Sequence, residues 1–367
     1  MSGIRNQAIH AGLNARFTEL DGQPVVAGYG DVAEEVRRVR ATGGLIDRSY
    51  RAVLSITGPD RGALLQSLST NNVVGQPVGS AIANAICTNH GKAQSLFTCI
   101  RLAESYLLDM DPLAAGDTAA FLEKYTIVRD AKTEDVSTDW GHIGLYGPQS
   151  LEVLAAATGG DALPDTEGAV VALADGVLVV ATAEAGLSGF ELLIPATHFA
   201  SLWERLMAAG REYGVTPFGV DALETLRIES GRPRFGVELD DGHIVLEAGL
   251  SDLVSFEKGC YLGQETLSRV VFRGQLSRRL CGLILDGDDV PQAGAPVLEA
   301  AGEGKEVGVV MSAVASPTLG KTVALAYLKR AFWEPGTKLT VGGVSAQVSE
   351  LPFVAPDVAQ GVHPAQG

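Results

Sequence analysis

The 367-residue sequence contains few cysteines. The four, Cys87, Cys99, Cys260 and Cys281, form no CxxC pair and no zinc-ligand spacing. This argues against a zinc site and against a disulfide framework. So few thiols in a chain of this length are typical of a reducing compartment. We therefore expect free cysteines and no bound metal.

Positive charge is also scarce. The chain has 28 Lys and Arg residues against 44 Asp and Glu residues, which gives a formal net charge of −16. Such a surface repels phosphate backbones, so we expect no direct nucleic-acid binding. One basic cluster lies between Arg269 and Arg279. It is either a solvated loop or a surface that meets an anionic ligand.

Long apolar runs are missing. No stretch approaches the roughly 18 apolar residues of a membrane span, and the opening MSGIRNQAIHAGLNARF has no apolar run of signal length. We expect a cytoplasmic protein that does not enter a membrane. Residues 354–367 lack a bulky apolar cluster, and we expect this tail to be disordered.

The pattern of turns and apolar residues predicts a repeated unit. Residues 1–30 show no strong periodicity, and a helix is expected to begin at Asp31. A strand, a Gly-Pro pair and a helix occur at residues 55–70 and again at residues 144–159, and three strands and a helix follow each copy. The predicted fold class is α+β, with a duplicated strand, helix, three-strand, helix module. Short strands over residues 275–353 predict a C-terminal antiparallel β-barrel.

The motif KGCYLGQE, Lys258 to Glu265, suggests a reactive thiol. Cys260 follows Lys258 by two residues and precedes a predicted helix that Gln264 opens. A nearby cation and a helix N-terminus both favour thiolate over thiol. The alternative is that Cys260 is a small buried hydrophobe. We favour the reactive thiol, because the flanking Lys and glycines are unusual in a buried core strand.

The N-terminal segment AIHAGLNARFTELDGQPVVAGYGDVAEEVRRVRATGGLIDRS, the C-terminal segment EVGVVMSAVASPTLGKTVALAYL and KGCYLGQE carry a family likeness. Over nearly its whole length the chain resembles the glycine-cleavage T-protein (aminomethyltransferase) superfamily. KGCYLGQE is similar to the signature of the YgfZ branch of that superfamily, where T-proteins carry a version without cysteine. The resemblance implies a three-domain clover-leaf ring with tetrahydrofolate in a central cavity.

The resemblance also implies domain boundaries. Folate-binding α+β modules are expected at residues 1–50 and 140–274, interleaved with a first repeat unit at residues 51–139. The barrel at residues 275–353 follows.

The resemblance further implies cofactor-binding residues. Glu191 in GFELL falls where the superfamily places a pteridine-binding glutamate, and a carboxylate can accept two parallel hydrogen bonds from a pterin edge. Arg227 falls in the Arg-x-Glu stretch of the family, where a guanidinium could face folate or its anionic tail. Ser95 and Tyr261 are the other cofactor-binding candidates.

Two positions depart from the T-protein pattern. Ser95, in GKAQSLF, stands where T-proteins carry an aspartate implicated in their one-carbon chemistry, and Leu96 follows it. A serine cannot be the same charged partner to an iminium-like carbon, which argues against aminomethyl transfer. Glu184 stands where a tyrosine is expected seven residues before Glu191.

Three functions remain open on the sequence alone. We favour a tetrahydrofolate-binding accessory protein for iron–sulfur enzymes, with Cys260 and Lys258 as its working residues and folate and iron–sulfur client enzymes as partners. A single motif cysteine suits a helper better than a cluster scaffold, which needs several thiolates. The second function is a tetrahydrofolate-dependent aminomethyl- or methyltransferase of the T-protein type. The third is a Cys–His hydrolase or acyltransferase that uses Cys260 with His198 or His243. No nucleophile-elbow pattern surrounds the thiol.

Overall fold

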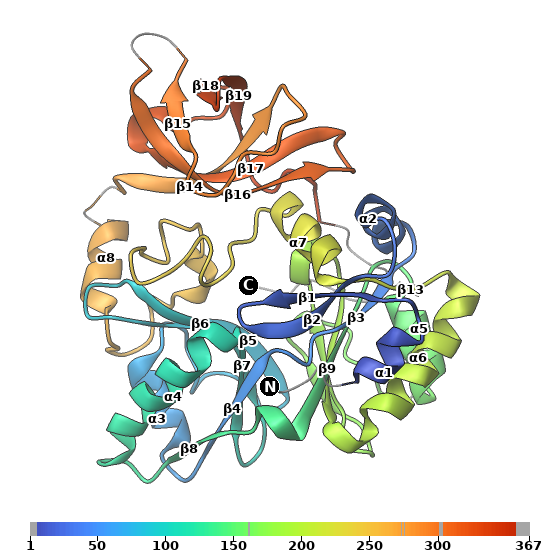
Figure 1. Cartoon of the computed structure of the whole chain (residues 1–367). Helices are drawn as coiled ribbons and strands as arrows, with labels where there is room; N and C mark the ends of the chain where they lie inside the picture. Colours follow the sequence, from blue (N-terminus) through green and yellow to red (C-terminus); the bar gives the residue numbers. More distant parts are fainter. Residues whose placement is uncertain (1–5, 161, 273, 275, 301–303, 357–367) are drawn as a thin grey trace.

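The fold contains two β-sheets flanked by helices and a separate C-terminal barrel (Figure 1). The computed structural model describes residues 6–160, 162–272, 274, 276–300 and 304–356. Most of the tail predicted to be disordered, residues 357–367, lies outside the described residues. The longest helices have 15 residues, and none in the described ranges has the length and apolarity needed to cross a membrane.

One sheet has five antiparallel strands in the order β5, β6, β7, β4, β8. Its covering helices bury Leu64, Leu65 and Leu122 against Ile56 and Leu108. These elements are β4 (Ala52–Thr57), α3 (Arg61–Leu68), β5 (Ser80–Cys87), β6 (Ala93–Arg101), β7 (Tyr106–Met110), α4 (Pro112–Thr126) and β8 (Lys132–Asp135).

The other sheet has six strands in the order β10, β11, β12, β9, β3, β13. Its helices bury Leu202 and Trp203 against Phe190. Strand β3 comes from the N-terminal part of the chain and pairs with β9. These elements are β3 (Gly44–Asp47), β9 (Trp140–Tyr146), α5 (Ser150–Thr158), β10 (Val170–Ala172), β11 (Leu178–Thr182), β12 (Gly189–Pro195), α6 (Phe199–Tyr213) and β13 (Thr216–Pro217).

The two sheets pack against each other through the faces that their helices leave open. Ile100 and Leu107 of the first sheet join Val180 and Leu193 of the second in one core cluster. Each half of this body runs strand, helix, three strands, helix along the chain. The predicted α+β class is confirmed.

The N-terminal segment adds a two-stranded hairpin that the sequence pattern did not indicate. It consists of β1 (Arg16–Leu20) and β2 (Gln23–Gly28), preceded by α1 (Gln7–Ala11). Helix α2 (Val32–Ala41) follows, and the Asp31 side chain caps it by accepting the Glu34 N–H at 3.0 Å. The helix predicted to begin at Asp31 is therefore confirmed.

The C-terminal strands close a six-stranded barrel in which every pair is antiparallel, as predicted. Its core includes Leu283, Val310 and Leu328. The strands are β14 (Arg278–Leu285), β15 (Pro296–Glu299), β16 (Glu306–Ser316), β17 (Lys321–Lys329), β18 (Lys338–Val341) and β19 (Val344–Ser349).

Helix α7 (Val220–Glu229) lies between the barrel and the two-sheet body (Figure 1). At its C-terminal end the buried Glu229 carboxylate accepts hydrogen bonds from Arg40 of α2 and from the hydroxyls of Ser316 and Thr318. One carboxylate therefore joins α2, α7 and the barrel. A long irregular segment follows α7 and leads to α8 (Gln264–Phe272).

We expect Glu229→Gln to lower the free energy of unfolding by about 3–5 kcal/mol, because the Arg40 guanidinium would remain buried without its anion. Glu34→Gln is the matched control, since Glu34 pairs with Arg37 and Arg38 on the exposed face of α2 and should change stability by less than about 1 kcal/mol. Urea unfolding measures both. Equal effects of the two substitutions would contradict the assigned role of Glu229.

Candidate functional site

A cavity of about 1090 Å³ lies where the two-sheet body, α7 and the barrel meet. This volume is at the upper end of the range for sites that hold small organic ligands. Its wall combines apolar side chains with several arginines and carboxylates. The apolar lining includes Leu96, Val220, Leu223 and Leu250, and the arginines are Arg48, Arg51, Arg227, Arg232, Arg234 and Arg279.

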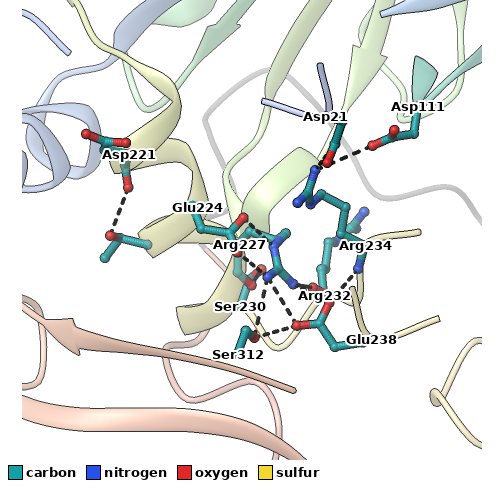
Figure 2. Close-up of polar contacts among 11 residues, drawn as sticks. Asp21, Asp111, Asp221, Glu224, Arg227, Ser230, Arg232, Arg234, Glu238 and Ser312 are labelled. Atoms are coloured by element: carbon teal, nitrogen blue, oxygen red, sulfur yellow. Dashed lines mark hydrogen bonds and ion pairs between the residues drawn. The ribbon is translucent and has the colours of Figure 1, made fainter. Parts of the chain in front are cut away.

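Arg227 lines this cavity, but its guanidinium is fully engaged by the protein (Figure 2). Nε and Nη2 donate to Glu224 at 2.9 and 2.5 Å, and Nη1 donates to Glu238 at 3.0 Å and to the Arg232 carbonyl at 2.6 Å. Nη2 also lies 3.5 Å from the Ser312 hydroxyl of β16. Burial opposes the charge of Arg227, yet the two glutamates raise its pKa. This residue is an anchor between α7, the loop after it and the barrel.

Arg234 performs a similar linking role on another wall of the cavity (Figure 2). Its Nη1 donates to Asp21 in the β1–β2 turn at 2.6 Å and lies 3.7 Å from Asp111. Asp111 also caps α4 by accepting the Leu113 N–H. Burial raises the pKa of Asp111 despite that bond and the nearby arginines. Arg234 therefore joins the hairpin to the first sheet.

Glu191 lies between the two sheets, behind the large cavity. Its Oε1 contacts the Arg48 guanidinium and the Tyr146 hydroxyl, and its Oε2 lies 2.5 Å from His142 Nε2. Burial alone would raise the pKa of Glu191, but Arg48 and His142, with a hydrogen bond from Tyr146, lower it to about 2. The carboxylate borders a separate space of about 30 Å³ and does not line the large cavity. Its three partners come from β9 and the segment after β3, and sequence reasoning did not identify them.

Glu184 is the carboxylate that reaches the large cavity near this cluster. It opens the 3₁₀ turn η2 (Glu184–Gly186) and lines both the large cavity and the small one. Its side chain is 39% exposed, and Oε1 lies 3.6 Å from Arg48 Nη2. The sequence marked this position only as a departure from the T-protein pattern.

Ser95 lies on β6, and its side chain is fully buried. Its hydroxyl has no hydrogen-bond partner among the described residues, and it does not line the large cavity, whereas Leu96 and Thr98 do. Side chains alternate along a strand, so Ser95 and Leu96 point to opposite faces. The position matched to the T-protein aspartate therefore holds a buried serine that does not line the cavity, and the next residue, Leu96, lines it.

The KGCYLGQE motif forms a loop beside the first sheet, and its three candidate residues do not line the large cavity. Lys258 is buried and donates from Nζ to the carbonyls of Ser69 and Asn71 at 2.6 and 2.7 Å. Burial lowers its pKa to about 8. Its Nζ also lies 4.7 Å from the centre of the Tyr261 ring. Lys258 therefore fastens the loop to the segment after α3.

Tyr261 is buried, and burial raises its pKa to about 12. Cys260, by contrast, is exposed, four residues before α8 begins at Gln264 as predicted. The other three cysteines are buried, and all four are free thiols. In the described part of the chain, no group of three or more His, Cys, Asp or Glu side chains could hold a metal ion.

Of the six candidate site residues, only Arg227 lines the large cavity. Glu191 is placed between the sheets, Ser95 in the wall of the first sheet, and the other three in the motif loop. The structure therefore places the exposed thiol of Cys260 outside the large cavity.

The pKa of Glu191 predicts a pH dependence of stability. Because folding lowers this pKa from 4.5 to about 2, the carboxylate stabilises the fold fully above about pH 4.5 and loses this effect as the pH falls towards 2. The stability difference between wild type and Glu191→Gln should be constant above about pH 5 and shrink below it. Urea unfolding at a series of pH values measures it. A difference that grows on acidification would contradict the assigned ion pairs.

Comparisons with known proteins identify the family. Residues 7–258 match the GCVT N-terminal domain, and residues 278–355 match the glycine cleavage T-protein C-terminal barrel domain. Proteins named aminomethyltransferase from Streptomyces avermitilis and Moorella thermoacetica are each 33% identical to this chain, over 358 and 354 residues. These matches cover 94% of this chain and 94% and 95% of the relatives.

A solved structure shares the fold. The aminomethyltransferase T of the glycine cleavage system from Bartonella henselae superposes with a TM-score of 0.90 at 23% identity, over 97% of this chain and 99% of that one. The resemblance to the superfamily is confirmed, while the relatives are aminomethyltransferases and do not single out the YgfZ branch. The chain belongs to the glycine cleavage T-protein family.

Proposed function

We propose that this chain binds tetrahydrofolate in the central cavity and acts in one-carbon transfer of the aminomethyltransferase type. Proteins of the family use tetrahydrofolate. The observation that carries the proposal is the cavity of about 1090 Å³ at the junction of the three parts of the fold. We therefore favour one-carbon transfer over the role of accessory protein for iron–sulfur enzymes, which the sequence alone had favoured.

The residues of the cavity fit such a ligand. Leu96, Val220 and Leu223 offer apolar surface for ring faces. Arg232 and Arg279 line the same cavity and have no carboxylate partner among the described residues. Two such guanidinium groups would suit the anionic tail of a folate. Arg279 is held in place by stacking over Trp333, 4.8 Å from the ring centre.

The chain's own residues would bind, orient and shield the ligand. When bound, tetrahydrofolate supplies the nitrogen atoms that carry a one-carbon unit. Leu96 offers no charge in its part of the cavity wall, so an electrostatic role would fall to a carboxylate elsewhere in the lining. Glu184 is half-exposed there and lies close to Arg48.

Tetrahydrofolate should bind to the wild-type protein with a stoichiometry of one, measured by calorimetry. Leu96→Trp should abolish this binding, because the larger side chain would fill part of the cavity. Leu319→Trp, at an exposed position of the barrel, is the matched control and should bind like wild type. Steady formation of methylenetetrahydrofolate from an aminomethyl donor tests the transfer itself. Absence of binding to the wild type would refute the proposal.

A second candidate function is support of iron–sulfur enzymes through Cys260, together with folate. The observation that favours it is the exposure of this one thiol, placed outside the cavity. One-carbon transfer and the support of iron–sulfur enzymes predict different results for Cys260→Ala. A transferase would keep its activity, whereas an accessory protein would fail to restore iron–sulfur enzyme activity in a strain that lacks this chain.

We expect iodoacetamide to label one of the four cysteines in the native protein and all four after denaturation, because only Cys260 is exposed and thiol modification requires access. Mass spectrometry of peptides identifies the labelled site. Native labelling of Cys87, Cys99 or Cys281 at a comparable rate would contradict this assignment.

A further inference from the structure

We infer that Glu184, rather than Glu191, is the carboxylate that accepts the N–H edge of the pterin ring. The inference rests on the proposed function, because it requires tetrahydrofolate to occupy the central cavity. It assigns the recognition of the ring to a residue where the family likeness led us to expect a tyrosine.

The carboxylate of Glu191 is enclosed by protein side chains, although its buried Oε2 has no hydrogen-bond partner among the described residues. Arg48 and Tyr146 contact its Oε1, and His142 lies 2.5 Å from its Oε2. A guanidinium presents two parallel N–H groups, as the amino-pyrimidine edge of a pterin does. Arg48 reaches Glu191 through Nη1 alone and so occupies Oε1, one of the two oxygens that a pterin edge would use.

The space beside Glu191 is also too small for a ring. It measures about 30 Å³ and lies between the two sheets, bordered by side chains such as Ile100, Val180 and Leu193. A space of this size has room for a few water molecules at most. A pterin could reach Glu191 only if the packed sheets separated and Arg48 left its buried position.

Glu184 has the properties that Glu191 lacks. It lines the large cavity, and 39% of its side chain is exposed. Its only described ion pair is the 3.6 Å approach to Arg48, and no hydrogen bond to its carboxylate occurs among the described residues. Both oxygens can therefore accept N–H groups from a ligand in the cavity.

The turn that carries Glu184 is rigid. Its carbonyl accepts the Leu187 N–H at 3.0 Å. Ala185 is buried and holds a φ of 52°, a left-handed conformation that residues other than glycine seldom adopt. Gly186 packs so closely on Ser230 at the end of α7 that a Cβ would come within 2.7 Å of that side chain. Such a turn keeps the carboxylate in place before any ligand arrives, which lowers the entropic cost of binding.

Arg48 acts as a positioning residue behind Glu184. Its Nη1 contacts Glu191, and its Nη2 faces Glu184. Glu191 thus fixes Arg48, and Arg48 lies beside Glu184 in the wall of the cavity. The apolar side chains of Val220 and Leu223 line the same cavity and would cover a ring face.

Calorimetric titration of the full chain tests this inference with two ligands, tetrahydrofolate and 6-methyltetrahydropterin, which lacks the tail. Glu184→Gln should weaken the binding of both by the same factor, about 10- to 100-fold, because an amide cannot accept two parallel N–H groups. Glu104→Gln, which changes an exposed carboxylate that does not line the cavity, should leave both affinities unchanged. Glu191→Gln should lower the melting temperature and leave the affinity of the folded protein within about threefold of wild type.

Each other outcome has a defined meaning. Wild-type affinity in Glu184→Gln would overturn the inference and leave the proposed function intact. A loss confined to tetrahydrofolate, with the pterin fragment bound normally, would place Glu184 at the tail and also overturn it. A loss of affinity in Glu191→Gln at an unchanged melting temperature would return the role to Glu191. Absence of any binding to the wild type would instead refute the proposed function itself.

Discussion

The arrangement of this molecule depends on two buried charges at the end of α7. Arg227 is held by Glu238 and approaches Ser312, while Glu229 binds Arg40 and Ser316. Both residues thereby reach β16 of the barrel. A buried charge without a partner costs several kcal/mol, so these contacts specify one position of the barrel against the two-sheet body. The cavity exists because the three parts meet in that position.

The cost of leaving a buried charge without a partner also explains how the other charged residues of the site are arranged. Buried ions are tolerated only when they are paired. Glu191 and Arg227 are paired with charged side chains, and Lys258 donates to carbonyl oxygens. They hold strands, helix and loop together and have little capacity left for a ligand. The groups that retain free hydrogen-bonding positions are the half-exposed ones at the cavity wall, above all Glu184. The groups that can still bind a ligand therefore lie at the cavity wall, next to the buried ion pairs.

Local patterns in the sequence predicted much of the fold. The cap at Asp31, the paired Gly-Pro turns and the alternating C-terminal strands each reflect interactions within a few residues, and the structure contains the helices and strands expected there. The β1–β2 hairpin was missed because β1 is largely exposed and shows no apolar alternation.

The site was harder to predict, because its contacts join distant segments. Glu191 was recognised as a carboxylate of interest, but its engagement by Arg48 and His142 depends on strand pairing across more than 40 residues. The orientation of Ser95 depends on the register of β6. Lys258 was expected to activate Cys260, yet its amine turns towards two carbonyls after α3. Sequence proximity gives no information about such directions.

Hydrogen–deuterium exchange with and without tetrahydrofolate shows whether this ligand occupies the cavity between the two-sheet body and the barrel. With the ligand in the cavity, we expect slower exchange in the turn at residues 184–187, in residues 96–98 of β6 and in the segment 230–235. We expect no change in β18 on the far part of the barrel. Unchanged exchange in these three segments at saturating tetrahydrofolate, or protection confined to the motif loop at residues 258–263, would contradict the proposed binding site.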